Sequence, residues 1–212
     1  MNPRPLFSFI LILLLLFSLG CEKPHVTGVG SEGIDISQDP AQSPLSSREP
    51  IVIEMKEGSF TLIPLAEYKL SGMVVSVESY TSGWESMISP YDLAIVWGKL
   101  AEPQYERFIS YRQRNRWYFY RYQRDCPLGE SYIISHSSNN HIIPGGENIR
   151  RAIKTIRKRD KVVLEGFLVN VKGAYKGQSV YWNTSLSRSD TGNGSCEIIF
   201  VSKIRIHDNL YE

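Results

Sequence analysis

Short runs of β-branched and aromatic residues, each bounded by turn residues, constrain the fold of this chain most strongly. These runs occupy 51–55, 60–64, 69–80, 92–98, 116–122, 161–171, 179–186 and 196–206. Such runs predict β-strands, and the first two, with only 56–59 between them, predict a hairpin. Residues 51–212 are numerous enough to enclose a hydrophobic core. The sequence therefore predicts a single β-rich globular domain over 51–212.

One segment has a helical rather than an alternating period. In ENIRRAIKTIRKR the apolar positions Ile149, Ala152, Ile153 and Ile156 recur at i, i+3, i+4 and i+7, with cations between them. This spacing predicts an amphipathic helix with one buried stripe. Three strands, a helix and two strands in this order are typical of an OB-fold barrel. We expect a β-rich α+β fold, either a small OB-like barrel or a twisted antiparallel sheet, with one amphipathic helix.

The first twenty-one residues predict export. One early cation, Arg4, precedes an uncharged and mostly apolar run from Leu6 to Leu19. This run is too short for a typical membrane-spanning helix and suits a secretory signal peptide. It ends in Phe17-Ser18-Leu19-Gly20-Cys21, which resembles the lipobox of bacterial lipoproteins, although Ser18 stands where leucine is usual. The resemblance implies lipidation of Cys21, with a plain signal peptide or an uncleaved short anchor as the alternatives.

Residues 22–50 have the composition of a tether. They hold four Pro, three Gly and five Ser, with no aromatic residue. Such a segment cannot bury enough apolar surface to offset the entropy lost on ordering. The prediction is a disordered tether between the signal peptide, 1–21, and the domain.

The stretch SHSSNNHIIP (135–144) raises the question of a site. His136, Asn139, Asn140 and His141 could contact a polar ligand, and the stretch is expected to be a loop between the third strand and the helix. Histidines five residues apart point to different sides of a helix or a strand. This spacing argues against a metal site, and no cofactor is predicted. The alternatives are a structural loop, a ligand-contacting loop, and a metal-binding or catalytic histidine.

Ser185–Gly194 is a second polar stretch, and it carries Arg188 and Asp190. It predicts a hairpin turn, or a loop that contacts the same ligand as SHSSNNHIIP. It lacks the G-K-[ST] ending of a phosphate-binding P-loop, and the chain contains no G-x-S-x-G or H-E-x-x-H pattern. Catalysis therefore has no sequence motif to support it.

Two cysteines, Cys126 and Cys196, remain beside the candidate lipidation residue. Exported domains fold in an oxidising compartment, so the pair predicts a disulfide. Two separate buried thiols are the alternative.

Charge is concentrated in one part of the chain. The whole chain has a net charge of +2, whereas residues 105–161 carry thirteen Lys or Arg against five Asp or Glu. If YRQRNRWYFYRYQR is one extended strand, alternation places a set of arginines and tyrosines on one face. These are Arg112, Arg114, Arg116, Tyr118 and Tyr120. The face predicts an anionic partner, whereas a solvated strand is the alternative.

Several segments together resemble a family of uncharacterised exported bacterial proteins. They are Trp97-Gly98, SHSSNNHIIP, GFLV (166–169) and WNTSLSRSDTGNGSCE (182–197). The resemblance implies an envelope location and a domain shape, but no mechanism.

Taken together, these features predict a lipid-anchored binding module of the cell envelope, on the outer membrane and facing the periplasm. Its expected partners are the membrane, through Cys21, and an anionic polysaccharide, lipid head group or acidic protein. Export makes a nucleic acid an unexpected partner. The alternative is a hydrolase on an OB-like scaffold with His136 or His141 as general base.

Overall fold

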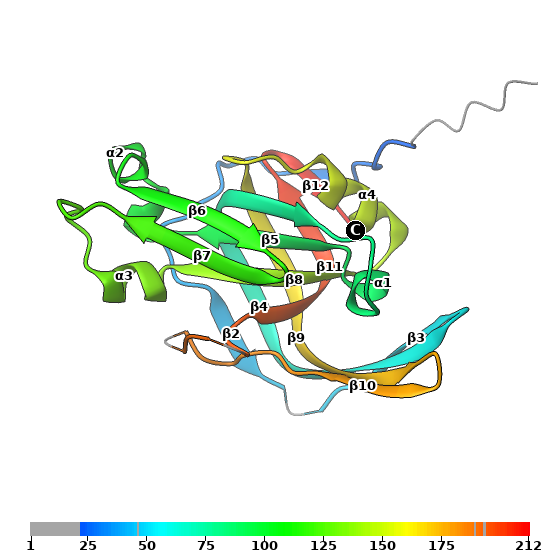
Figure 1. Cartoon of the computed structure of the whole chain (residues 1–212). Helices are drawn as coiled ribbons and strands as arrows, with labels where there is room; N and C mark the ends of the chain where they lie inside the picture. The colour runs from blue at the N-terminus through cyan, green and yellow to red at the C-terminus, as the bar shows by residue number, and fades with distance from the viewer. Residues whose placement is uncertain (1–21, 46, 189, 193) are drawn as a thin grey trace, which may run out of the picture.

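The computed structural model describes residues 22–45, 47–188, 190–192 and 194–212. Strands make up 49% of the chain and helices 14%, which confirms the β-rich α+β class. Figure 1 shows a strongly curved sheet with a hairpin projecting from one side and a curved arm of strands at the opposite end.

Among the described residues, ten strands belong to the main sheet and two form a separate hairpin. The main sheet contains β1 (Gly28–Val29), β2 (Ala41–Pro44), β3 (Ile51–Met55), β4 (Gly58–Ser79), β5 (Tyr91–Val96), β8 (Ser137–Pro144), β9 (Lys161–Tyr175), β10 (Gln178–Trp182), β11 (Glu197–Ile206) and β12 (Asn209–Tyr211). The hairpin consists of β6 (Ile109–Arg114) and β7 (Trp117–Tyr122). The helices are α1 (Glu85–Ile88), the 3-10 helix η1 (Gly98–Ala101), α2 (Pro103–Glu106), α3 (Glu130–Ser135) and α4 (Glu147–Thr155).

Five long strands surround the largest apolar cluster. β4 pairs with β5 and β9, β5 pairs with β8, and β11 pairs with both β8 and β9. All of these pairings are antiparallel except that of β8 with β11. Alternate residues such as Leu70, Leu93, Ile142 and Leu164 are fully buried between the strands.

Helix α4 packs against this cluster, as its period predicts. Ile149, Ala152 and Ile153 are buried on one side of the helix, and Ile156, just past its end, joins them. The cations between these positions lie on the outer side. The predicted amphipathic helix is therefore confirmed, with its bounds shortened to nine residues.

The predicted first hairpin is also confirmed. β3 and β4 are joined by the two-residue turn Lys56-Glu57. β4 continues beyond the predicted strand 60–64 because it merges with the predicted strand 69–80. Its first half pairs with β3 and with the end of β9, which also pairs with β10. These strands form the curved arm at the lower right of Figure 1, called the arm below.

The stretch SHSSNNHIIP is not a loop. Residues 137–144 form β8, which is paired on one side with β5 and on the other with β11. Positions 138–143 are all buried. The loop prediction is wrong because the polar side chains find partners inside the fold. Asn140, for example, donates hydrogen bonds from Nδ2 to the Leu93 carbonyl and to Ser138 Oγ.

The arginine–tyrosine stretch is a hairpin rather than one strand. Asn115 and Arg116 have φ of 53° and 69°, the left-handed backbone of a two-residue hairpin turn. The chain reverses there, so the single-face prediction is wrong. The register pairs Arg112 with Phe119 and Tyr111 with Tyr120. Arg112 and Arg114 therefore lie on the opposite face of the hairpin from Tyr118 and Tyr120, and Arg116 lies in the turn.

Residues 22–45 and 47–50 lie along the domain, so the predicted free tether over 22–50 is wrong for them. β1 pairs with β12, and β2 pairs with β4. Near the start, Asn148 of α4 accepts a hydrogen bond from the backbone N–H of His25. The composition did not predict this ordered structure, because the segment pairs with the edges of other strands through its backbone and buries little apolar surface of its own.

Candidate functional site

A buried charged group lies on the outer face of β5 and β8. Asp92 of β5 and His141 of β8 are directly opposite each other in the sheet, and both side chains are almost fully buried. Arg116, in the turn between β6 and β7, donates from Nη1 to Asp92 Oδ1 at 2.8 Å and from Nη2 to the Ser89 carbonyl at 2.8 Å. The hairpin turn thus places the Arg116 guanidinium beside a carboxylate that is buried in the sheet.

His141 lies within ion-pair distance of Asp92 but makes no hydrogen bond to it. Its Nδ1 lies 2.9 Å from Asp92 Oδ1. Among the described residues, this Nδ1 has no hydrogen-bond partner. Asp92 Oδ2 is likewise without a partner within that part of the chain.

Aromatic rings enclose the charged group. The Arg116 guanidinium lies 3.9 Å from the centre of the Tyr80 ring and 5.4 Å from that of Trp182. The Trp182 ring centre is also 4.6 Å from that of His141. Contacts of this kind favour a cation that has lost most of its hydration. Trp182 comes from β10, so the arm contributes one wall and the hairpin another.

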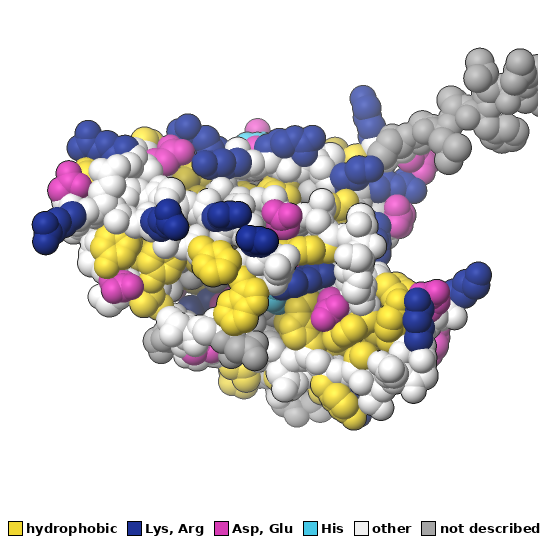
Figure 2. All heavy atoms as spheres, viewed as in Figure 1, with side chains coloured by type: hydrophobic (Ala, Val, Ile, Leu, Met, Phe, Trp, Pro, Cys, Tyr) yellow, Lys and Arg dark blue, Asp and Glu magenta, His cyan; other side chains and the backbone are white. Residues whose placement is uncertain are grey.

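A pocket of about 340 Å³ opens above this charged floor. Its lining residues are Arg116, Trp117, His141, Tyr181, Trp182, Asn183, Gly192, Gly194 and Cys196. Trp117 and Tyr181 are 44% and 72% exposed, which is unusual for such large rings. Figure 2 shows a hollow on this side of the molecule, with apolar, cationic and histidine side chains around it.

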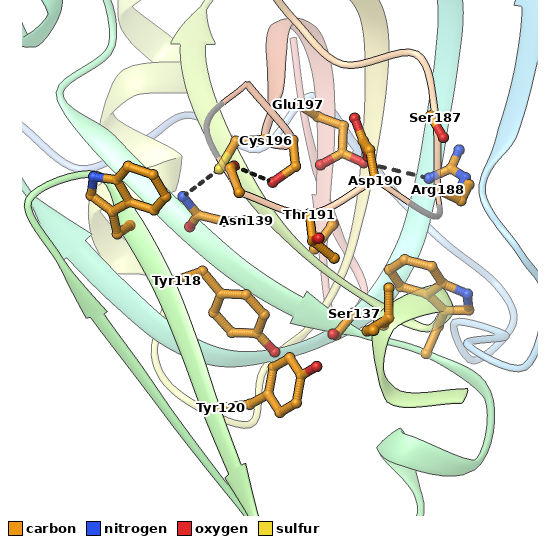
Figure 3. A pocket seen from close by; sticks show the side chains of 16 residues that line it. Tyr118, Tyr120, Ser137, Asn139, Ser187, Arg188, Asp190, Thr191, Cys196 and Glu197 are labelled. Carbon is orange, nitrogen blue, oxygen red and sulfur yellow. Dashed lines mark hydrogen bonds and ion pairs between the residues drawn. The ribbon is translucent and has the colours of Figure 1, made fainter. Parts of the chain in front are cut away.

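A second pocket, of about 140 Å³, adjoins the first. Both have Trp117, Gly192 and Cys196 in their walls, and together they are called the cleft below. In Figure 3 the side chains of Arg188, Asp190 and Glu197 stand on one side of the second pocket, and those of Tyr118 and Tyr120 stand on the opposite side. The loop between β10 and β11 thus forms one wall, and the hairpin the other.

Glu197 is an unusual acid because it is only 4% exposed. Arg188 Nη1 lies 3.7 Å from Glu197 Oε1, and the same nitrogen donates to the Tyr68 hydroxyl at 2.7 Å. Burial nevertheless raises the pKa of Glu197 to about 8, because a long ion pair to a partly exposed arginine does not offset the lost hydration. The carboxyl is therefore mostly protonated at neutral pH.

The second pocket contains polar atoms that the fold leaves unsatisfied. Glu197 Oε2 and the Tyr118 hydroxyl are buried, and among the described residues neither makes a hydrogen bond of good geometry, although Ser137 lies beside the tyrosine hydroxyl. Both side chains line the pocket. A buried polar atom without a partner is costly, so these two atoms indicate a place for the hydroxyl groups of a ligand.

Cys196 lies between the two pockets as a free thiol. Asn139 Nδ2 donates to its sulfur at 3.5 Å, and burial raises the pKa of the thiol to about 11. It therefore remains a thiol at neutral pH and is a poor nucleophile. Cys126 is also free and packs in the apolar cluster under the hairpin. The predicted disulfide is absent because the fold places these cysteines in different environments.

The residues predicted from sequence do not form one site. Asn139, Arg188 and Asp190 come together in the second pocket, and His141 lines the first. Asn140 points to the other side of β8 and is fully buried.

His136 ends α3 and stacks on Tyr132 with ring centres 3.7 Å apart, so the two histidines do not share a pocket. Within the described part of the chain, no group of three or more His, Cys, Asp or Glu residues could hold a metal ion.

Sequence reasoning missed several residues of this region. Among them are Trp117, Trp182 and Glu197 in the walls of the cleft, and Asp92, which is buried beneath it. Two of them left a signal, because Asp92 and Glu197 are lone acids at the starts of the apolar runs DLAIVW and EIIFV. An acid beside a buried strand is rare unless it is paired. The two tryptophans gave no comparable indication.

Family models, curated proteins and solved structures all give no match to the chain. The charged floor, the exposed rings and the unsatisfied polar atoms are therefore the features of the cleft that bear on its function.

Proposed function

We propose that β4, β5, β8, β9 and β11 form a small OB-like barrel. Their order along the chain, with α4 between the third and fourth, is the order of an OB fold. The pairing of each strand with two others of the set, and the parallel pairing of β8 with β11, support this. OB folds bind ligands on their second and third strands and under the loop between the fourth and fifth. The cleft occupies the corresponding place, on β5 and β8 and beside residues 183–196.

We further propose that the protein is a binding module whose cleft holds an oligosaccharide. The observation that carries this is the pairing of exposed rings, Trp117 and Tyr181, with unsatisfied buried polar atoms on Glu197 and Tyr118. Flat rings pack on the apolar faces of sugars, and polar atoms between them bind hydroxyl groups. Charges within the cleft nearly cancel, which favours a hydroxyl-rich ligand over a polyanion.

The expected result for Trp117→Ala is at least a tenfold weaker affinity for the bound saccharide, because a stacked ring contributes about 1.4 kcal/mol or more. Binding is measured by calorimetry on the best ligand from an array of neutral and anionic oligosaccharides. Phe119→Ala is the matched control, since Phe119 lies on the same strand and has a similar exposure but does not line the cleft. Absence of saccharide binding, or equal loss in the control, contradicts the proposal.

The proposed location is the cell envelope, with the chain anchored by lipid on Cys21. The lipobox-like sequence supports this, although 1–21 lie outside the described residues. No helix among the described residues is long and apolar enough to span a membrane.

Replacement of the anchor residue tests the proposed location. Cys21→Ser should abolish incorporation of labelled fatty acid and leave an uncleaved precursor in a bacterial host. Processing of the variant to a soluble mature form would instead identify a plain signal peptide. Lys23→Ser, two residues beyond the anchor, serves as the control and should be processed like the parent.

A hydrolase is the second candidate, with His141 as general base. The closeness of His141 to buried Asp92, and the presence of Cys196 in the same pocket, favour it. Two observations favour binding instead: the high pKa of the Cys196 thiol and the engagement of Asp92 by Arg116. His136 is a weaker general-base candidate because its Nδ1 is within hydrogen-bond distance of Ser135 Oγ and the Tyr132 carbonyl. Hydrolysis of an ester or glycoside panel, lost in His141→Gln, would support the hydrolase.

A further inference from the structure

The hairpin exposes a second surface that the cleft does not use. Opposite residues of an antiparallel pair lie on the same face, and the register pairs Arg112 with Phe119 and Ser110 with Arg121. These residues and Arg114 are exposed. They form the outer hairpin face. The inner face carries Tyr111, Tyr118 and Tyr120, which pack on the apolar cluster outside β4 and β5.

The charge of the outer hairpin face is not balanced within the protein. Residues 109–122 contain four arginines and no aspartate or glutamate. Arg116 is paired with Asp92. No carboxylate of the described chain pairs with Arg112, Arg114 or Arg121. Like charges two residues apart on one strand face repel each other, so this arrangement favours an external anion.

The same face carries exposed apolar surface and a hollow. Phe119 is 50% exposed, and it lines a hollow of about 500 Å³ together with Arg112, Arg114 and Arg121. Figure 2 shows a row of cationic side chains beside a row of large apolar side chains over β6 and β7. The hairpin projects from the body of the molecule in Figure 1 and can therefore approach an extended surface.

We propose that the outer hairpin face binds the phosphate head groups of an anionic lipid bilayer. Guanidinium groups match phosphate oxygens in pairs. An exposed ring among cations enters the interface between head groups and acyl chains. Neither the guanidinium groups nor the exposed ring requires a partner that surrounds the hairpin. A flat membrane surface therefore fits this face better than a folded protein does.

The start of the described chain fits the same partner. Glu22 forms an ion pair with Arg151 of α4. If Cys21 is lipidated, as proposed above, only one peptide bond separates the anchor from a residue held on the domain. The domain would then lie against the bilayer rather than at the end of a long tether, and a weak basic surface would act as the second membrane signal.

The test uses residues 22–212, which contain all the described elements and no lipid anchor. A negative result in this test would therefore say nothing against lipidation or saccharide binding. We expect cosedimentation with vesicles of phosphatidylcholine and phosphatidylglycerol, and much less with phosphatidylcholine alone. Arg112→Gln/Arg114→Gln should lower the partition coefficient about tenfold to thirtyfold, because each cation near an anionic surface raises that coefficient about fivefold. Binding should weaken steeply with salt.

Lys56→Gln/Lys172→Gln is the matched control. It also removes two exposed cations that have no ion pair within the described chain, but from the arm. It should bind as the parent does, and both double variants should keep the parent melting temperature. Equal binding by parent and Arg112→Gln/Arg114→Gln overturns the proposal, as does an equal loss in the control. Binding to dextran sulfate or inorganic phosphate without binding to vesicles also overturns it, by assigning the face to a soluble anion.

Discussion

Asp92→Asn is expected to lower the free energy of unfolding by about 3–5 kcal/mol, because it leaves a partly buried guanidinium without its counter-charge. The Asp92 side chain is fully buried and that of Arg116 is 18% exposed, so water cannot replace the lost contact well. The substitution keeps the size of the side chain, which isolates the effect of charge. Denaturation by urea, followed by tryptophan fluorescence, measures the change.

A double-mutant cycle separates the ion pair from other effects of the substitution. Arg116→Gln alone should be strongly destabilising, and Asp92→Asn/Arg116→Gln should cost less than the two single changes together. Lys69→Gln is the control. Lys69 and Glu165 form an exposed ion pair, and its loss should lower the free energy of unfolding by less than about 1 kcal/mol. A cost for Asp92→Asn no larger than that of the control would show that the hairpin turn is not held by this pair.

Glu197→Gln is expected to stabilise the protein increasingly as the pH rises from about 4.5 to 8. Burial raises the pKa of Glu197 from 4.5 to about 8. Between these values the folded state keeps a proton that the unfolded state has lost, so the free energy of unfolding falls as pH rises. The glutamine variant lacks this dependence. A pKa difference of this size corresponds to a relative gain on the order of 4 kcal/mol across the window.

Melting temperatures of parent and variant at pH 5, 6, 7 and 8 measure the effect. The two proteins should be closest at pH 5 and differ most at pH 8. Glu67→Gln, which changes an exposed carboxyl on β4, should follow the parent at every pH. A constant difference between Glu197→Gln and parent would mean that Glu197 is ionised in the folded state, and that Arg188 compensates its burial.

Elements with a regular local pattern were predictable from the sequence. The β-branched runs 51–55 and 161–171 predict strands, and the helical spacing of Ile149 and Ile153 reports which side of the helix is buried. The structure confirms β3, β9 and α4 at these places. The polar strand β8 was not predictable, because Asn139, Asn140 and His141 resemble a loop unless β5 and β11 are known to flank them.

The sequence by itself determined the β-rich class and the amphipathic helix, and it motivates the still untested prediction of export. These conclusions depend on composition and on periods within one segment. Only the tertiary structure decided the cleft, because its residues come from separate strands and loops. Asp92, Arg116 and Glu197 are far apart in the chain, and one turn at Asn115 and Arg116 reverses which side chains share a face. Contacts between distant segments have no local period, so no pattern within one segment could predict them.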